Sequence, residues 1–422
     1  MMPTKNKDQF DLVVIGGGPA GMMAAGRAAE CGAKVLLIEK TYRLGSKLLL
    51  TGGGKCNITN NAEMPEMITA FGKDGKFLYR ALTVFSRDDL IEFFTLRGVT
   101  MQTEPDGRVL PLNKKAEDVL AVLRTYLEEH NVSILHNTTV ATIQYGSKNK
   151  TGLKGITTSD GKMINTTKLI IATGGKSYSA TGSTGDGYEM AKQCGHTIEK
   201  ISPGLSALES NSFFIKELQG LTLQDIGISV IVGDSKKSTA KGNLLFTHFG
   251  VSGPIVLNLS GTIIDALANK SQVELALNLR PDYSDKEFDK ILSKDICSFG
   301  NRTVSQYFKK TLPPSLASVM EKLCSAIINK KCSVVNREER QRIASLLTDF
   351  RITISRARPI EEATITRGGV SLKELNPQTM ESKLVKGLYF CGEVINLAGL
   401  TGGYNLQEAF STGYLAGQSA AK

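Results

Sequence analysis

Three glycines near the start of the chain have the spacing of a phosphate-binding turn. Gly16, Gly18 and Gly21 follow a short apolar run and open a stretch rich in small residues. In a G-x-G-x-x-G turn the first glycine permits a tight bend, the second lets the backbone approach a pyrophosphate, and the third allows close helix–strand packing. Free N–H groups at the start of the helix attract the phosphate charge. The spacing therefore predicts dinucleotide binding, without distinguishing FAD from NAD.

The elements around this turn complete the unit. Residues 10–15 form an apolar run typical of a buried parallel strand, residues 19–30 predict a helix, and residues 34–39 predict the next strand. Glu39 stands 23 residues after Gly16, where a carboxylate accepts hydrogen bonds from ribose hydroxyls. A glycine-rich turn of an unrelated α/β protein lacks this full context. We therefore expect an α/β, Rossmann-like dinucleotide-binding domain.

A second glycine pair, near the far end of the chain, favours one dinucleotide. The apolar run 387–391 ends at Gly392 and Glu393, and Gly402 and Gly403 open a predicted helix. In flavoproteins of the two-dinucleotide-binding type, such a strand end contacts the ribityl and phosphate region of FAD. The start of the following helix lies at the pyrimidine edge of the flavin, where its positive end stabilises the charge of the reduced ring. The pair favours FAD and a discontinuous domain; a glycine-rich turn before a terminal amphipathic helix is the alternative.

Few side chains could act on a substrate beside a flavin, which itself transfers the hydride or electrons. Lys55 could stabilise negative charge, His248 could donate a proton, and Arg367 could bind a carboxylate or phosphate of the substrate. His248 is equally interpretable as a hydrogen-bonded structural histidine, and Arg367 as a solvated side chain beside a Gly-Gly turn. Cys56 is also interpretable as a small buried packing residue, and Tyr404 as a residue that packs at the start of a helix. The sequence offers no convincing Ser-His-Asp set.

The chain is long enough for two or three domains. It has 422 residues, of which 41% are hydrophobic, and this exceeds the size at which one core stops growing. Near residue 200 the pattern changes to short alternating stretches, which predict antiparallel strands, followed by a mainly helical pattern. We expect a discontinuous FAD-binding domain of residues 1–198 and 360–422, a β-rich insert of residues 199–282 and 350–360, and a helical subdomain of residues 283–349. Other predicted elements are helices at 77–98, 116–130 and 187–194, and strands at 132–146, 153–158 and 169–172.

Net charge and cysteine spacing indicate the cellular location and the partners to expect. The net charge is +10, which suits either a solubilising surface or an acidic partner. The seven cysteines form neither a C-x-x-C redox pair nor the spacing of a zinc site. There is no signal-peptide apolar region and no run of eighteen apolar residues. We therefore expect a cytoplasmic protein with no membrane span and no bound metal.

Several further motifs carry a resemblance to a known family. Over nearly its whole length the chain resembles the bacterial BaiN-like or aminoacetone-oxidase-like FAD-binding flavoproteins, also called HI0933-like or YhiN-type. The resemblance rests on motifs at residues 51–60, 172–175, 184–187, 246–254, 366–370, 379–383 and 402–407. It implies an FAD domain interrupted by a barrel-like β domain and a small helical domain. Lys55 stands where arginine is common, and residues 395–397 replace a more acidic segment, which weakens transfer of a particular substrate.

Motifs and resemblance together give a set of predicted FAD contacts. They are Gly16, Gly18, Pro19, Ala20, Gly21, Glu39, Lys40, Gly53, Gly54, Cys56, Asn57, Val140, Thr173, Gly174, Gly175, Asp186, Gly392, Glu393, Gly402, Gly403, Tyr404, Asn405 and Leu406.

The expected function is FAD-dependent oxidation or reduction of a small organic metabolite. The resemblance implies reduction of a carbon–carbon double bond or oxidation of an amine. Without a second G-x-G-x-x-G, NAD(P)H is a candidate only as a transient electron donor. The alternatives are a flavin redox sensor without turnover and an RNA-interacting flavoprotein. Residues 301–360 hold twelve Lys/Arg against four acids, yet mixed signs and few aromatic residues make nucleic acid the less favoured partner. Substrate, electron acceptor and oligomeric state stay open.

Overall fold

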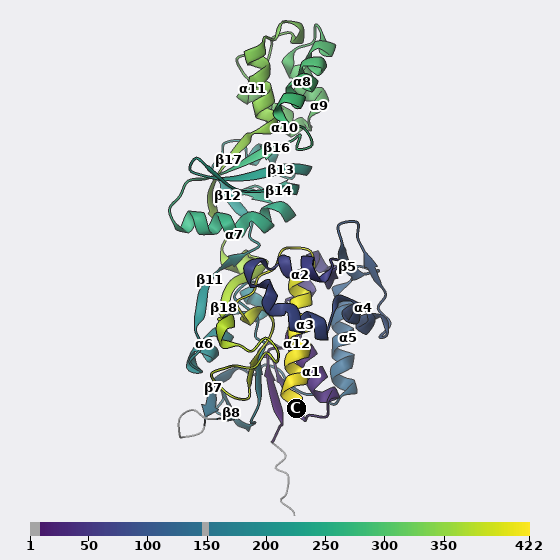
Figure 1. Cartoon of the computed structure of the whole chain (residues 1–422), viewed down its shortest axis with the longest axis vertical. Coiled ribbons are helices and arrows are strands. Elements are labelled where there is room, and N and C mark those ends of the chain that lie inside the picture. Colours follow the sequence, from purple (N-terminus) through teal and green to yellow (C-terminus); the bar gives the residue numbers. More distant parts are fainter. Residues whose placement is uncertain (1–8, 146–151) are drawn as a thin grey trace, which may run out of the picture. The chain divides into compact units, whose positions relative to one another are not determined.

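The computed structural model describes residues 9–145 and 152–422 and divides into two compact units. Unit 1 comprises Met1–Gly204 and Ile360–Lys422, and unit 2 comprises Leu205–Pro359 (Figure 1). The division follows Gly204 rather than residue 198, because strand β11 (Ile198–Gly204) pairs with β18 (Ile365–Val370) inside unit 1. Unit 1 is thus built from two separate stretches of chain.

The centre of unit 1 is a five-stranded parallel sheet in the order β19-β10-β1-β2-β6. Its strands are β1 (Leu12–Ile15), β2 (Val35–Ile38), β6 (Ser133–Leu135), β10 (Leu169–Ile171) and β19 (Leu388–Phe390). Strands β1, β2, β10 and β19 are buried along their whole length, as expected for a parallel sheet covered on both faces. Because β19 pairs with β10, the second stretch of chain completes the sheet begun by the first.

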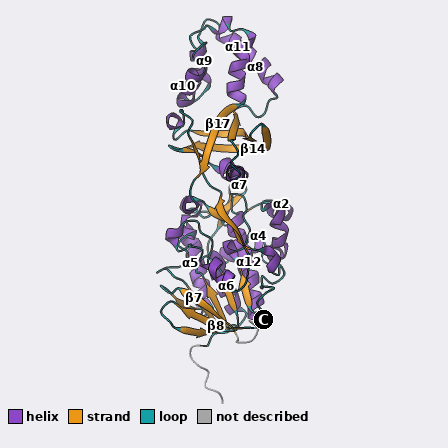
Figure 2. Ribbon diagram, turned by 90° about the vertical axis from the view of Figure 1, so that its left-hand side faces the viewer, coloured by secondary structure: helices purple, strands orange, loops and turns teal. Residues whose placement is uncertain are grey.

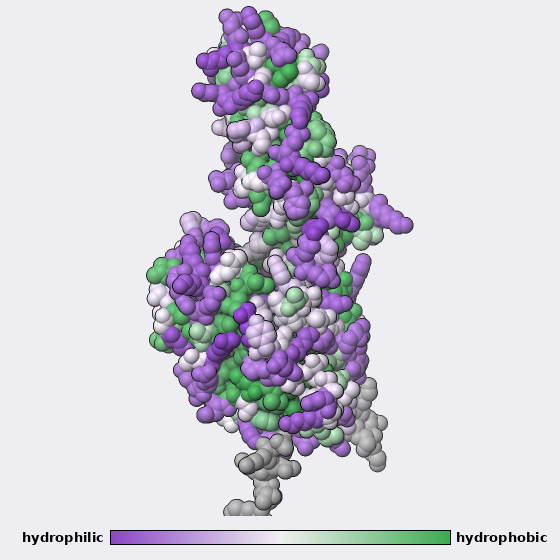
Figure 3. Space-filling view, turned by 180° about the vertical axis from the view of Figure 1, so that it is seen from behind, coloured by the Kyte–Doolittle hydropathy of each residue, from purple (hydrophilic) through white to green (hydrophobic). Residues whose placement is uncertain are grey.

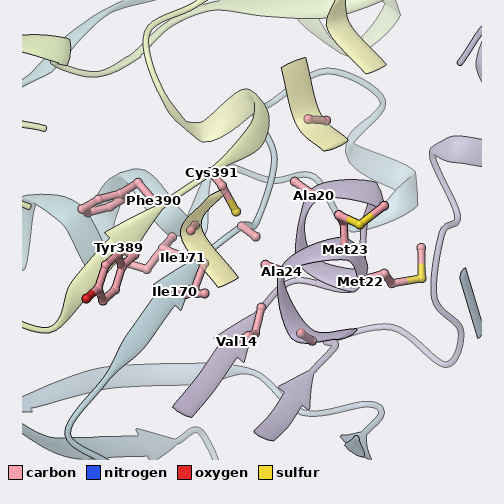
Figure 4. Packing of buried hydrophobic residues seen from close by; sticks show 14 of the residues in the cluster. Val14, Ala20, Met22, Met23, Ala24, Ile170, Ile171, Tyr389, Phe390 and Cys391 are labelled. Carbon is pink, nitrogen blue, oxygen red and sulfur yellow. The ribbon is translucent and has the colours of Figure 1, made fainter. Parts of the chain in front are cut away.

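Helix packing ties the two ends of unit 1 together. Helix α12 (Tyr404–Ala421) lies against α1 (Pro19–Glu30), and a Cβ at Gly413 would come within 2.4 Å of the Ala20 carbonyl oxygen. The same substitution at Gly417 would meet the Ala24 carbonyl oxygen at 2.3 Å. The two helices therefore approach backbone to backbone. Figure 4 shows Ala20 and Ala24 on the side of α1 that faces the apolar residues of β1, β10 and β19, and Met22 and Met23 on its other side.

Smaller elements surround this core. Two antiparallel sheets contain β3 (Thr59–Asn60), β4 (Met101–Thr103) and β5 (Arg108–Pro111), and β7 (Val140–Tyr145), β8 (Leu153–Thr158) and β9 (Met163–Asn165). The helices are α2 (Met64–Thr69), α3 (Tyr79–Val84), α4 (Arg87–Thr95), α5 (Ala116–Glu129) and α6 (Asp186–Gln193).

Two predicted elements each divide into two. The strand predicted at 132–146 is β6 and β7 in different sheets, because the chain turns between them at Asn137, which has φ +50°. The helix predicted at 77–98 is α3 and α4. Ser86 separates them and caps α4 by accepting a hydrogen bond from the Asp89 amide.

Unit 2 contains a closed six-stranded barrel and a group of helices (Figure 2). The barrel order is β12-β15-β14-β13-β16-β17, and closure removes the exposed strand edges of an open sheet. Its strands are β12 (Leu208–Ser210), β13 (Thr222–Val232), β14 (Ser235–Phe246), β15 (Gly250–Ser252), β16 (Val273–Asn278) and β17 (Phe350–Ala357). The helices are α7 (Pro254–Ala268), α8 (Asp285–Phe299), α9 (Val304–Thr311), α10 (Pro314–Leu323) and α11 (Arg337–Thr348). The barrel-like insert with added helices is confirmed.

Candidate functional site

The glycine-rich turn has the geometry that its spacing predicts. Gly16 has φ +107°, and a Cβ there would come within 2.4 Å of the Ala172 carbonyl oxygen. A Cβ on Gly21 would lie 1.9 Å from the Gly16 carbonyl oxygen, so both positions require glycine. Around Gly18, in contrast, no atom lies within 4 Å of a Cβ. The turn thus leaves open space at its middle glycine.

Helix α1 begins directly after this open position. Gly18 is the N-cap residue, Pro19 follows at the first helical position, and no described side chain caps the helix start. The first N–H groups of a helix lack partners inside the helix and carry partial positive charge. The open space at Gly18 therefore lies where backbone donors can receive a phosphate.

Glu39 is held at the end of β2 by three donors. The Gly17 amide donates to Oε2 at 2.8 Å, and the Thr41 amide and hydroxyl donate to Oε1 at 2.7 and 2.8 Å. These bonds fix the carboxylate beside the glycine turn. Each carboxylate oxygen has two lone pairs, so the oriented carboxylate keeps acceptor capacity for a ribose hydroxyl.

A pocket at the ends of β1 and β2 gathers five of the predicted contacts. Gly16, Lys40, Val140, Thr173 and Asp186 all line it, although they span 170 positions of sequence. Parallel strands present their carboxyl ends at one edge of the sheet, and ligands of open α/β folds bind at that edge. The pocket therefore lies at the edge of the sheet where open α/β folds bind their ligands.

Lys40 and Asp186, predicted as separate cofactor contacts, contact each other. The Lys40 Nζ lies 2.7 Å from the Asp186 Oδ2, and Thr184 also binds the pair. Burial acts to raise the pKa of Asp186, but the hydrogen bonds from Lys40 and Thr184 outweigh burial and lower it. Asp186 is thus an ionised, positioned carboxylate at the pocket wall.

The loop that carries Lys55 is shaped by glycines. Gly52, Gly53 and Gly54 have φ +58°, +66° and +89° and form the last part of the kinked 3-10 segment Leu48–Gly54. Lys55 is exposed and Cys56 is completely buried. Burial raises the pKa of the Cys56 thiol to about 12, so the thiol stays protonated and is a poor nucleophile.

Lys47 and Ser177, which the motifs did not identify, bind Glu393 and so help to join the two stretches of unit 1. The Lys47 Nζ lies 2.7 Å from the Glu393 Oε2 and 2.6 Å from the Ser177 hydroxyl oxygen. The Thr366 amide donates to the Glu393 Oε1 at 2.7 Å, and the Ser177 hydroxyl donates to the same atom at 3.1 Å. Both carboxylate oxygens of Glu393 therefore have protein partners. Glu393 is predicted to contact the cofactor, but its protein partners lie up to 346 positions away in the chain and leave no local signal in the sequence.

The start of α12 is pressed against β3. Gly402 and Gly403 have φ +113° and +102°, and a Cβ on Gly403 would lie 2.0 Å from the Thr59 carbonyl oxygen. The Asn60 side chain donates to the Gly402 carbonyl at 3.0 Å. No described side chain caps the start of α12, so its first N–H groups lack a side-chain partner.

A buried carboxyl lies one turn into α12. Glu408 is 4% exposed, and its nearest hydrogen-bonding group is the Thr412 hydroxyl, at 3.4 Å from Oε1. Burial, reinforced by the negative charge of Glu393, raises the pKa of Glu408 to about 8. Glu408 is therefore a neutral acid at pH 7, a property that its place on a helix does not reveal.

A Ser-His-Glu arrangement occurs in unit 1 although the sequence offered none. His196 Nδ1 lies 3.1 Å from Glu374 Oε2, and Nε2 lies 2.8 Å from the Ser382 hydroxyl oxygen. That hydroxyl oxygen also accepts the amide hydrogens of Leu384 and Val385, and His196 is 4% exposed. The Ser382 oxygen is thus occupied and buried. This arrangement fastens a loop rather than supplying a nucleophile.

The three predicted catalytic side chains are divided between the units. Lys55 and Arg367 lie in unit 1, and His248 lies in unit 2. His248 is exposed on the turn between β14 and β15, where the Thr247 amide donates to the Gly250 carbonyl at 2.9 Å. Arg367 is half-buried on β18. Their catalytic roles stay predictions.

Buried polar atoms provide a test of whether FAD fits unit 1. Asn57 Oδ1, Thr173 Oγ1 and Arg43 Nε are buried without a hydrogen-bond partner among the described residues. Buried polar atoms are almost always satisfied, and Asn57 and Thr173 belong to the predicted FAD contacts. With the open turn at Gly18 and the uncapped helices α1 and α12, these atoms match a ligand rich in donors and acceptors. The residues present fit FAD.

The comparison with known proteins agrees with this geometry. The family model described as the HI0933-like protein Rossmann domain matches residues 10–419. The chain belongs to this flavoprotein family. The protein is thus an FAD-binding-type flavoenzyme of the oxidoreductase class, as predicted.

Two relatives align along almost the whole chain. The chain is 30% identical over 415 residues to a ribosomal RNA dihydrouridine synthase of Escherichia coli (strain K12), covering 97% of this chain and 98% of the relative. It is 28% identical over 411 residues to a 3-dehydro-bile acid delta(4,6)-reductase of Clostridium scindens, with coverage of 97% and 98%.

Solved structures share the fold at lower identity. The open conformation of a flavocytochrome c3 fumarate reductase has a TM-score of 0.54 at 17% identity and covers 99% of this chain and 79% of its own. The 3-ketosteroid delta1-dehydrogenase of Sterolibacterium denitrificans has a TM-score of 0.55 at 13% identity, with coverage of 98% and 100%. Both comparisons support the fold alone.

No helix in residues 9–145 and 152–422 is long and apolar enough to cross a membrane. No group of three or more His, Cys, Asp or Glu side chains in them could hold a metal ion.

Proposed function

We propose that this protein uses FAD to reduce a carbon–carbon double bond conjugated to a carbonyl group. The observation that carries the proposal is the pair of full-length relatives, a dihydrouridine synthase and a delta(4,6)-reductase. Each name describes hydrogen added to a ring double bond, and in uracil and in a 3-oxo-steroid diene that bond is conjugated to a carbonyl. Conjugation makes the far carbon electrophilic, so it can accept a hydride.

Bound FAD would supply the hydride from its reduced ring. The Gly16–Gly21 turn and the start of α1 would hold the pyrophosphate, and Glu39 would orient the ribose. The N–H groups at the start of α12, after Gly403, would stabilise negative charge on the flavin. The Cys56 thiol, with its pKa near 12, serves packing rather than electron transfer.

Reduction of the conjugated bond also needs a proton at the second carbon. His248 is exposed, and an imidazole is the side chain that most often transfers protons in enzymes. We assign the proton donor to the His248 imidazole. His248→Gln should lower kcat with little change in KM, whereas the control His130→Gln should leave kcat unchanged. Equal kcat in wild type and His248→Gln would exclude this donor.

The uracil ring of an RNA is the substrate to test first. One full-length relative acts on ribosomal RNA, and residues 301–359 of unit 2 carry twelve basic against four acidic side chains. Such an excess attracts a polyanion. From the sequence pattern alone, nucleic acid is the less favoured partner. The full-length similarity to a ribosomal RNA dihydrouridine synthase makes RNA the more favoured substrate. A free steroid-like ring is the second candidate, supported by the bile acid reductase.

The test is flavin reoxidation by each substrate. The enzyme is reduced anaerobically with NADPH or NADH, and then mixed with a uridine-containing ribosomal RNA transcript or a steroid 4,6-dien-3-one. Recovery of the oxidised flavin absorbance with either compound, together with the saturated product by mass spectrometry, supports the proposal. Failure with both, or rapid peroxide formation with a small amine in air, would overturn it.

A further inference from the structure

Three basic side chains lie together where the helices of unit 2 turn. We call Arg302, Lys331 and Arg337 the basic tip. The Cys332 amide donates to the Arg302 carbonyl at 2.8 Å, and Thr303 and Lys331 form a backbone bridge. Arg337 opens α11 directly after its N-cap residue Asn336. Backbone pairing therefore brings the chain segments that carry Arg302 and Lys331, 29 positions apart, next to each other.

The charges of the basic tip are not neutralised locally. Residues 300–303 and 330–337 contain four basic and no acidic side chains. In the described chain Lys330 pairs with Glu339 at 2.7 Å and Arg340 with Asp289 at 3.0 Å, while no described carboxylate lies within ion-pair distance of the three tip residues. Asp289, which pairs with Arg340, also attracts Arg337 without forming an ion pair with it, and Glu338 follows Arg337 in the chain. The tip keeps a net positive charge toward solvent.

The tip is also exposed and firmly supported. Arg302, Lys331 and Arg337 are exposed, and the face of these helices in Figure 3 is mainly hydrophilic. Beneath them Cys332 is 2% and Val304 1% exposed, and the Ser333 amide binds the Gly300 carbonyl at 2.8 Å. A supported backbone lowers the ordering cost of binding. Val334, at 58% exposed, is a single apolar residue and offers no membrane-inserting face.

We propose that the basic tip contacts the phosphate backbone of an RNA and holds it while a uracil is reduced. The proposal rests on the RNA substrate proposed above. Three exposed cations suit a chain of singly charged phosphates, and contacts to phosphates are independent of sequence. The Arg302 guanidinium also lies 5.7 Å from the centroid of the Phe299 ring, which helps to position it. The tip then supplies affinity, and the flavin unit supplies the chemistry.

The experiment measures binding of a fluorescein-labelled, 30-nucleotide uridine-containing RNA hairpin to the FAD-loaded enzyme as salt is varied. The test variant combines Arg302→Glu, Lys331→Glu and Arg337→Glu. Losing three phosphate contacts should lower the slope of log K against log salt by about 2 to 3 and raise Kd at least about tenfold near 0.1 M salt. Flavin absorbance and melting temperature should match wild type, because all three side chains are exposed.

The matched control combines Lys236→Glu, Lys237→Glu and Lys270→Glu, which changes net charge equally at other exposed positions of unit 2. This control should keep a Kd within about threefold of wild type. An equal loss in both variants, or no loss in the tip variant, would overturn the proposal.

Activity separates the two proposals. Turnover of a steroid 4,6-dien-3-one or of free uridine should be the same in the tip variant and wild type, while turnover of the RNA falls through KM. Loss of small-substrate turnover in the tip variant would overturn the assignment of the tip to RNA. Absence of any double-bond reduction by wild type would instead overturn the proposed function, even if the tip bound RNA.

Discussion

Gly18 offers a direct test of the pyrophosphate site, because space near it is open while Gly21 is enclosed. Gly18→Ala places a Cβ where no described atom lies within 4 Å, and Gly18 has φ −79° and ψ −178°, which alanine adopts without strain. Alanine is a poorer N-cap than glycine by about 0.5–1 kcal/mol, and the stiffer unfolded chain offsets about 0.4–1 kcal/mol. The apoprotein should therefore change in stability by less than about 1 kcal/mol.

FAD binding should respond far more strongly to the same change. A methyl group in the turn keeps phosphate oxygens from reaching the backbone donors, and each lost hydrogen bond to a charged group costs about 1.5–3 kcal/mol. Loss of one such bond raises the Kd for FAD by about 10- to 150-fold. Titration of deflavinated protein with FAD, followed by flavin fluorescence, measures this Kd, and thermal melting measures the stability.

Gly21→Ala is the contrasting variant. Its Cβ would lie 1.9 Å from a backbone oxygen, so α1 must shift, and the apoprotein itself should lose about 1–3 kcal/mol. If Gly18→Ala binds FAD as tightly as wild type, the phosphate does not occupy the turn. If the Gly18→Ala apoprotein has a melting temperature as low as that of Gly21→Ala, the space around Gly18 is not open.

Buried titratable groups give three further predictions. Burial lowers the folded pKa of His196 below its ordinary 6.5. As pH drops below about 6.5 the unfolded chain therefore binds a proton before the folded chain does, and the free energy of unfolding should fall. A melting-temperature difference between wild type and His196→Gln that does not depend on pH would contradict this. Glu408 has the opposite effect, because folding raises its pKa from 4.5 to about 8, so stability is lost as pH rises through that window. Glu408→Gln should remove this loss. A wild-type melting temperature that stays the same from pH 5 to 8 would refute the conclusion that Glu408 is a neutral acid. Cys56→Ala should keep turnover within about threefold of wild type, because a thiol with a pKa near 12 supplies no thiolate at neutral pH. A tenfold loss of kcat with FAD still bound would show that Cys56 takes part in catalysis.

The cofactor turn was predictable because its determinants are local. Gly16, Gly21 and Glu39 lie within 24 consecutive positions, and their steric and hydrogen-bonding demands leave a direct pattern. The insert was also predictable, since alternating and helical periodicities replace each other along the chain. The Rossmann-like unit and the inserted barrel are confirmed.

The long-range polar contacts were not predictable in this way. Lys47 and Glu393 meet across 346 positions, and neither side chain carries a signal of its partner. Lys40 and Asp186 each had the chemistry of a ligand contact, but their ion pair depends on how α6 packs. Neutral Glu408 looks like any helical glutamate until its burial is known. These properties arise from tertiary packing rather than from spacing.

The split construction of unit 1 has a consequence for biosynthesis. Strand β19 and helix α12 leave the ribosome after all of unit 2, so residues up to Gly204 wait for about 200 further residues. At about 5–20 residues per second the wait is about 10–40 s, during which β10 has an unpaired edge and α1 lacks its partner helix. All six strands of the barrel are synthesised before β19 and α12, so the barrel can fold first. Newly made protein should therefore acquire flavin only after its last helix emerges, and chaperones that shield sheet edges should engage the chain before that moment.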